Sequence, residues 1–365
     1  MVQPVRFPNR VEDITSEILT NVISQTHPGA AVEGFDIVSA RGLGKMVSTA
    51  GRATLDLRYR PGSPPLPRRV IVKMTIDKPG APGVLFETEI GIYKRMLPEL
   101  AIEKAFFLGG TYDDDTERFG LILEDLSERA ATFPNAFETR VTAEQVSATL
   151  DLLATVHAHY WNSPRLESER SWLSSLVDGV QFDFFDKNTV PIIDDLVSKS
   201  VYRQSLITRL GRKPQKLWDN VKAVHRYHSR LPQTLLHGDT GVHNSYRLPD
   251  GSVGMIDWQL SVRGPWPHDV HYIICTALTI EDRRKNERAL VERYLQRLAE
   301  LGVKELPALD DAMEQYARAI VWGFTIGWLM APTENYGPEI LQANLDRLIA
   351  AAEDWRSFSL ADAIS

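Results

Sequence analysis

The sequence predicts an α+β protein of two lobes, with a strand-rich part followed by a mostly helical part. Five short segments between residues 30 and 124 are apolar runs or alternate apolar with polar residues, as strands do. Beyond residue 143, apolar residues recur at helical spacing instead. A chain of 365 residues also exceeds the usual size of one hydrophobic core, which favours two lobes.

The overall composition indicates a globular protein and excludes several functional classes. Hydrophobic residues make up 43% and charged residues 24%, and the formal net charge of −7 without a Lys/Arg run argues against nucleic-acid binding. The single cysteine, Cys275, excludes a disulfide framework and a zinc cluster. The first ten residues lack an apolar signal core, and the longest apolar stretch, 319–331, is too short to span a bilayer. We therefore expect a cytoplasmic protein without a membrane partner.

The N-terminal part begins with a helical pattern over 11–26, and strand patterns follow it. The predicted strands are 32–41, 52–59, 69–74, 104–112 and 118–124. Between the first two, Gly42 and Gly44 allow backbone amides to approach phosphate oxygens, and Lys45 or Ser48 could add a contact. Val47 replaces the third glycine of the full G-x-G-x-x-G pattern, so a plain hairpin is the alternative interpretation.

A lysine ends the third predicted strand. The segment Arg-Val-Ile-Val-Lys-Met matches the Val-Ala-Ile-Lys pattern, in which a strand lysine, here Lys73, points at nucleotide phosphates. The alternative is an exposed lysine at a sheet edge. A carboxylate partner is expected on the next helix, predicted over 85–97, where Glu87 and Glu89 are the candidates.

The stretch 234–259 carries the strongest functional pattern. An apolar run leads into a short loop, and a Pro-Asp-Gly turn predicts a β-hairpin over 246–257. The loop holds Asp239 and Asn244, and Asp257 ends the hairpin, which matches the kinase order Asp-x4-Asn followed by a metal-binding aspartate. One carboxylate can orient or deprotonate an acceptor hydroxyl, and an amide oxygen with a second carboxylate suits Mg²⁺. The pattern predicts phosphoryl transfer.

The blocks His-Gly-Asp-x4-Asn and Ile-Asp-Trp-Gln resemble the aminoglycoside phosphotransferase and choline kinase group of kinase-like small-molecule enzymes. The block IDWQLSVRGPWPHDVHYII is most similar to the ecdysteroid kinase-like branch of that group. The resemblance covers about residues 30–280. It implies a protein-kinase-like two-lobe fold with an antiparallel five-stranded sheet, in which Glu89 holds Lys73 and His237 supports the catalytic loop.

The same resemblance implies how the lobes divide the work. Residues 1–124 would form the nucleotide-binding lobe, and 125–365 the catalytic and acceptor-binding lobe. The hinge would lie at 121–128, where the backbone of Glu124 and Leu126 would pair with the adenine edge. A helical insertion at about 165–233 would wall the acceptor site.

The helical part contains further supporting residues. The predicted helices are 143–161, 270–279, 282–301, 308–330 and 338–355. We interpret His157 as a core histidine that supports the catalytic loop, and Asp269 as a structural residue that caps a helix or braces the loop. Gly323 and Gly327 lie four residues apart, so close helix packing is expected there. Trp-Gln follows Asp257 where protein kinases have Phe-Gly, which argues against a protein substrate.

These observations predict an ATP- and Mg²⁺-dependent kinase of small molecules. Asp239 would act on the acceptor, and Asn244 and Asp257 would bind Mg²⁺. The aromatic content of 165–233 favours a bulky apolar alcohol or hydroxyacyl compound, whereas its several aspartates leave an aminoglycoside open, and a choline-type amino alcohol is a further alternative. A catalytically silent nucleotide-binding scaffold and an enzyme that transfers AMP are the alternatives of another class.

Overall fold

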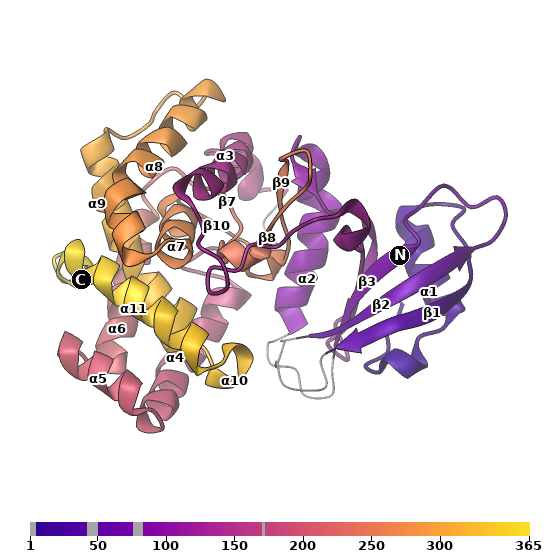
Figure 1. Ribbon diagram of the computed structural model, residues 1–365, viewed down its shortest axis with the longest axis horizontal. Coiled ribbons are helices and arrows are strands. Elements are labelled where there is room, and N and C mark those ends of the chain that lie inside the picture. The colour runs from indigo at the N-terminus through magenta and orange to yellow at the C-terminus, as the bar shows by residue number, and fades with distance from the viewer. Residues whose placement is uncertain (1–4, 42–49, 76–82, 170–171) are drawn as a thin grey trace. The chain divides into compact units, whose positions relative to one another are not determined.

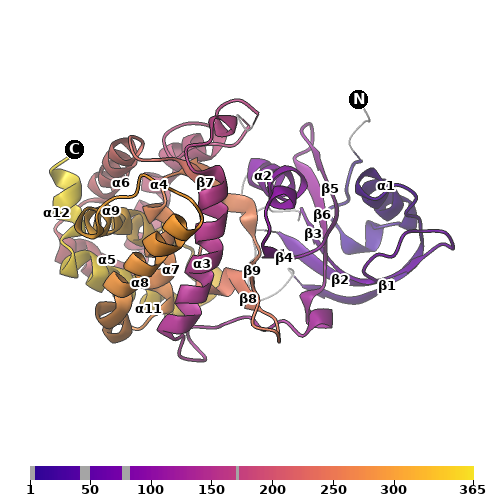
Figure 2. The same cartoon turned by 90° about the horizontal axis from the view of Figure 1, so that it is seen from above.

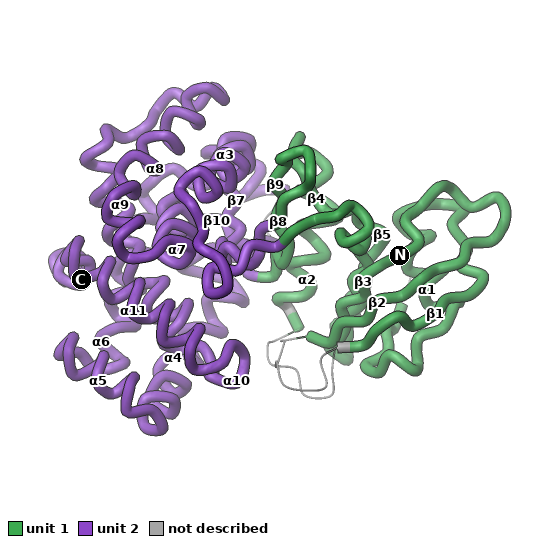
Figure 3. Tube along the Cα trace, in the orientation of Figure 1, with its two compact units in different colours: residues 1–132, 246–259 green, residues 133–245, 260–365 purple. Residues whose placement is uncertain are grey.

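The computed structural model describes residues 5–41, 50–75, 83–169 and 172–365 (Figure 1). Its chain forms two compact units, shown in different colours in Figure 3. Unit 1 comprises residues 1–132 and 246–259, and unit 2 comprises residues 133–245 and 260–365. Unit 1 therefore contains the hairpin region that the sequence analysis places in the C-terminal lobe.

Unit 1 contains the predicted five-stranded sheet. Its strands are β1 (Val32–Arg41), β2 (Gly51–Tyr59), β3 (Arg69–Met74), β5 (Phe107–Asp113) and β6 (Arg118–Glu124). They are arranged in the order β1-β2-β3-β6-β5, and every neighbouring pair is antiparallel. The α+β fold class with an antiparallel sheet is confirmed.

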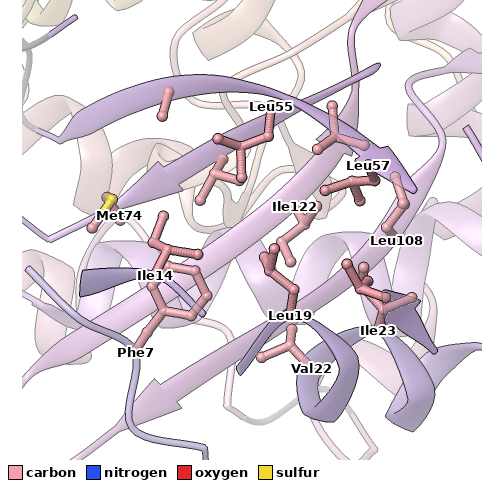
Figure 4. Close-up of a cluster of buried hydrophobic side chains, with 14 of the residues drawn as sticks. Phe7, Ile14, Leu19, Val22, Ile23, Leu55, Leu57, Met74, Leu108 and Ile122 are labelled. Atoms are coloured by element: carbon pink, nitrogen blue, oxygen red, sulfur yellow. The ribbon is translucent and has the colours of Figure 1, made fainter. Parts of the chain in front are cut away.

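A helix covers each face of this sheet (Figure 2). Helix α1 (Ser16–Thr26) begins at Thr15, whose hydroxyl accepts a hydrogen bond from the backbone N–H of Ile18. The apolar side of α1 packs on one sheet face, as Figure 4 shows. The buried residues of this core include Leu19, Val22, Ile23, Leu55, Leu57, Val70, Val72, Met74, Leu108 and Ile122. Because side chains alternate along a strand, Arg52 and Lys73 belong to the opposite face.

That opposite face is covered by α2 (Gly83–Gly91), which continues as a π-helical segment, Ile92–Met96. Phe86 of α2 stacks on Phe119 of β6 with ring centroids 3.9 Å apart. This stacking fixes the helix against the sheet and places the next turn of α2 near the end of β3.

The strand predicted over 104–112 is divided in the structure. Its first part, β4 (Glu103–Lys104), leaves the sheet and pairs in parallel with β9 (Val253–Met255), which also pairs with β8 (Ser245–Arg247). Two donors hold the carboxylate of Glu103 there. Arg129 donates to it at 2.8 Å, and the hydroxyl of Tyr246 also donates to it at 2.8 Å. Strands β8 and β9 form the predicted hairpin.

Unit 2 is mostly helical, as predicted. Its longer helices are α3 (Ala143–Tyr160), α4 (Val180–Ser198), α5 (Val201–Leu210), α6 (Pro214–His228), α7 (Pro267–Ala277), α8 (Ile280–Glu300), α9 (Leu309–Trp322) and α11 (Pro338–Asp354). Helix α3 starts with a capping box formed by Thr142 and Gln145, and it packs along α8 (Figure 2). Helices α4, α5 and α6 lie within residues 165–233, the segment for which a helical insertion is expected. No helix in the described part of the chain is both long and apolar enough to cross a membrane.

Helix α9 continues into a π-helical segment, Gly323–Leu329, where it packs on α7. A Cβ atom added to Gly327 would lie 2.7 Å from the ring of Tyr272, and one added to Gly323 would lie 2.9 Å from His271. The close packing predicted from these two glycines is confirmed.

Candidate active site

The His-Gly-Asp loop lies in unit 2, between a short strand and a helical turn. It follows β7 (Thr234–Leu236), which pairs with β10 (Val262–Gly264), and it ends in the 3-10 turn Val242–Asn244. Asp239 is partly exposed, and the side-chain nitrogen of Asn244 donates to its backbone oxygen at 2.9 Å and to its carboxylate at 3.1 Å. These bonds orient the carboxylate and leave the amide oxygen of Asn244 as the group that can bind a cation.

His237 is fully buried beside this carboxylate. Its Nδ1 atom accepts a hydrogen bond from the backbone N–H of Asp239 at 3.3 Å. His237 therefore contributes to the shape of the loop.

Asp269, at the start of α7, braces the loop through hydrogen bonds. Its carboxylate accepts hydrogen bonds from the backbone N–H groups of His237 at 2.8 Å and of Gly238 at 3.0 Å. His157 of α3 lies 3.2 Å from the same carboxylate. Burial favours the neutral acid, but the hydrogen bond from His157 holds the pKa of Asp269 below its ordinary value. The structural interpretations of Asp269 and His157 are confirmed.

Gly238 occupies a position that no other residue suits. Its φ angle is +84°, and an added Cβ atom would lie 1.9 Å from the backbone oxygen of Leu260. We expect Gly238→Ala to destabilise unit 2 by at least ~2 kcal/mol, because strain in the left-handed region adds to a backbone clash. Gly211→Ala is the matched control, since φ is +62° there but nothing lies within 4 Å of an added Cβ.

The free energies of unfolding of both variants, from denaturant titration, test this expectation. Gly211→Ala should cost only about 1 kcal/mol, the strain alone. Equal losses in the two variants would show that Leu260 does not restrict the loop.

Lys73 of β3 lies in unit 1 and is only 6% exposed. Its Nζ atom lies 2.7 Å from the carboxylate of Glu89 on α2 and 2.8 Å from that of Asp257. Glu87, the alternative partner, is exposed. Burial alone would lower the pKa of Lys73, but the carboxylates of Asp257 and Glu89 hold it above its ordinary value, so this lysine stays charged.

Asp257 has a strained backbone, with φ at +65°. Aspartate is among the few residues other than glycine that adopt the left-handed region, at a cost of about 1 kcal/mol. Its two carboxylate oxygens are held by different cations, Lys73 and Arg52, the latter at 3.3 Å. Strain of this kind persists where neighbouring interactions compensate for it, and it is common at functional sites.

Two residues at this site were missed by the sequence analysis. Arg52 contacts Asp257, and the side-chain oxygen of Gln259 lies 3.4 Å from Nζ of Lys73. The polar alternation of β2 and its antiparallel register with β3, in which Arg52 lies opposite Lys73, are the signals that could have found Arg52. Gln259 stands two residues after Asp257 within the block already singled out.

The expected hinge follows directly from β6. Glu124 ends that strand, and its carboxylate accepts from the backbone N–H of Phe106 at 2.8 Å and from Arg129 at 3.1 Å. Leu126 is buried and begins the 3-10 turn Leu126–Arg129. Contact of these two residues with adenine stays a prediction. Gly42, Gly44, Lys45 and Ser48, expected to approach the phosphates, lie outside the described residues.

The residues expected to hold Mg²⁺ fit that ion chemically. The amide oxygen of Asn244 and the carboxylate of Asp257 are hard oxygen donors, and Mg²⁺ is usually bound by one or two such groups together with substrate phosphates. Asp257 already attracts two cationic side chains, which shows that its position favours positive charge.

The fold is that of the kinase-like small-molecule phosphotransferases. An ethanolamine kinase from Plasmodium vivax is 12% identical in sequence, and its structure aligns with a TM-score of 0.54. The alignment covers 90% of this chain and 85% of the ethanolamine kinase. Two structures with lower TM-scores are a spectinomycin phosphotransferase in complex with ADP and spectinomycin (12% identity, 93% and 99% covered, 0.49) and a GDP complex of an aminoglycoside 2'-phosphotransferase (11% identity, 93% and 100% covered, 0.48).

Residues 44–306, more than half of the chain, match the model of the ecdysteroid kinase-like family, and the chain belongs to this family. None of the curated proteins matches the sequence. The resemblance stated from the sequence blocks is confirmed. Family and fold together support a small-molecule phosphotransferase of the aminoglycoside phosphotransferase and choline kinase-like type.

Proposed function

We propose that this protein transfers the γ-phosphate of ATP to a hydroxyl group of a small molecule, with Mg²⁺ as cofactor. The observation that carries the proposal is the buried, charged Lys73 held between Glu89 and Asp257. A cation kept charged in a buried position, beside a strained aspartate, suits a site that receives phosphates.

Each residue has a chemical task in this proposal. Lys73 binds the phosphates, and Glu89 fixes the direction of its ammonium group. Asp239 accepts a hydrogen bond from the acceptor hydroxyl and takes its proton as the phosphoryl group is transferred. Asn244 and Asp257 would hold Mg²⁺, which when bound neutralises charge on the phosphates. Catalysis of this kind depends mainly on positioning and electrostatic stabilisation.

A small cavity in unit 2 bears on the identity of the acceptor. It has a volume of about 20 Å³, room for roughly one water molecule or one hydroxyl group. Its lining includes Phe182, Phe185, Trp218, Trp322, Gln181 and His225. His268 also lines it and is hydrogen-bonded to the backbone of Gly238, so the cavity adjoins the catalytic loop.

Two residues that line this cavity carry a buried hydrogen-bond acceptor. His225 donates from Nδ1 to the backbone oxygen of Leu176, and burial holds its pKa well below the ordinary value, so its Nε2 atom is an acceptor. Gln181 donates from Nε2 to the backbone oxygen of Leu260, which leaves its side-chain oxygen as an acceptor. Neither acceptor has a hydrogen-bond partner among the described residues.

A hydroxyl group on an apolar body could donate its one hydrogen to either of these acceptors, within an aromatic lining. The hydroxyl would donate into the cavity, and the apolar part would lie on the half-buried rings of Phe182 and Phe185. The nearby carboxylate of Asp186 is neutralised by Lys222 at 3.1 Å, so it offers little to a polycation. We therefore favour a bulky, uncharged alcohol over an aminoglycoside or a choline-type amino alcohol.

His225→Phe should raise the KM of the preferred acceptor about tenfold and leave the KM of ATP unchanged, because one hydrogen bond to the acceptor is lost. His228→Phe is the matched control, since His228 is also a buried histidine of α6 but does not line the cavity. Steady-state kinetics with each substrate varied in turn provides the measurement. An unchanged acceptor KM in His225→Phe would exclude the cavity from acceptor binding.

The proposed reaction is tested by measuring ADP release from Mg·ATP with four acceptor pools: hydroxylated sterols, hydroxyacyl compounds, aminoglycosides and amino alcohols. We expect release with the sterol or hydroxyacyl pool. Pyrophosphate in place of ADP would indicate transfer of AMP. ATP binding without product in any pool would favour a silent scaffold. We further propose a cytoplasmic location and no nucleic-acid or membrane partner.

A further inference from the structure

Two cations of unit 1 share one carboxylate. Nζ of Lys73 lies 2.8 Å from one oxygen of Asp257, and Nη2 of Arg52 lies 3.3 Å from the other. The antiparallel register of β2 and β3 places Arg52 directly opposite Lys73. Since both side chains lie on the same sheet face, two positive charges are neighbours across the strands.

This arrangement needs an anion to be stable. Like charges directly opposite one another in a sheet are destabilising. Glu89 is buried against Lys73 at 2.7 Å, so Asp257 is the carboxylate that serves both cations. Within the described residues, Arg52 forms its ion pair with Asp257.

Arg52 differs from Lys73 in its exposure to solvent. Its side chain is 46% exposed, whereas that of Lys73 is 7% exposed. An exposed ion pair of this kind contributes little to stability, because water screens it. Arg58 on the same face of β2 forms such a pair with Asp36 and has no link to the proposed site.

We propose that Arg52 is a second phosphate-binding cation of the nucleotide site. The inference rests on the proposed function, in which Asp257 is a ligand of Mg²⁺. Mg²⁺ held by Asp257 would neutralise the carboxylate charge that attracts Arg52 at 3.3 Å. The guanidinium group then turns to a phosphate oxygen beside Lys73, and its planar pair of N–H groups matches phosphate well.

The test compares Arg52→Gln with wild type in binding adenosine, AMP, ADP and ATP, each in the presence of Mg²⁺, by calorimetry. Loss of a charge-assisted phosphate contact should weaken ATP binding about tenfold or more and leave adenosine binding unchanged. Arg52→Lys should recover part of the ATP affinity, because the charge is kept and the planar fork is lost. Arg58→Gln, the matched control, should bind all four ligands as wild type does.

Each other outcome has a definite meaning. Wild-type ATP affinity in Arg52→Gln would overturn the inference and leave the proposed function intact. Equal weakening of adenosine and ATP would also overturn it, since the effect would then not involve phosphate. Failure of the folded wild type to bind ATP at all would overturn the proposed function and this inference together.

Discussion

Asp239→Asn should slow turnover by about 10²–10⁴ while nucleotide binding stays nearly intact. An amide has the shape of the carboxylate but cannot take the acceptor's proton, and it lacks the charge that orients the hydroxyl. Loss of such a group typically lowers the rate by about 10²–10⁴. The hydrogen bonds from Asn244 end on the backbone oxygen as well as the carboxylate, so the loop should keep its fold.

The comparison needs a control with the same chemical change. Asp250→Asn is suitable, because Asp250 lies exposed at the turn of the hairpin, where asparagine also fits. Steady-state rates and ATP affinity should be measured for both variants. A near wild-type rate in Asp239→Asn would refute the assignment of Asp239 to the chemical step.

Asp269→Ala should lower the free energy of unfolding by roughly 3–5 kcal/mol. The variant leaves the backbone N–H groups of His237 and Gly238 without their buried acceptor. It also removes one of the hydrogen-bond partners of His157, which keeps its bond to Tyr294. Activity should fall as well, because these two N–H groups hold the loop that carries Asp239.

Denaturant titration of Asp269→Ala beside Asp186→Ala measures this difference. Asp186 also accepts hydrogen bonds, from Trp218 and Lys222, but it is exposed, so its loss should cost less than about 1 kcal/mol. Similar losses in the two variants would contradict the view that Asp269 is the main support of the loop.

Predictions from the sequence were most accurate where the local pattern of apolar and polar residues determines the local structure. Strands 32–41, 69–74 and 118–124 are found at their predicted limits, because their apolar residues alternate or run together between clear turn signals. The helical pattern left Glu87 and Glu89 open and the family resemblance selected Glu89, and in the structure Glu89 contacts Lys73 while Glu87 is exposed. The loop around Asp239 could be found because its residues are close together in the chain.

Long-range pairing explains what the sequence did not reveal. The division of the predicted strand 104–112 depends on Glu103, whose partners Arg129 and Tyr246 are distant in the chain. The position of Arg52 opposite Lys73 depends on the register between β2 and β3. The orientation of Gln181 and His225 toward one cavity depends on how α4 and α6 pack, which the pattern of either helix alone does not determine.

The central claim, transfer of a phosphoryl group to a small alcohol, is tested most directly with ATP labelled in its terminal phosphate. Wild type and Asp239→Asn are incubated with Mg²⁺ and the acceptor pool that releases ADP, and the products are separated. Our account predicts label on the acceptor with the wild type and far less with Asp239→Asn. Label found only in inorganic phosphate, or equally on the acceptor with both proteins, would contradict it.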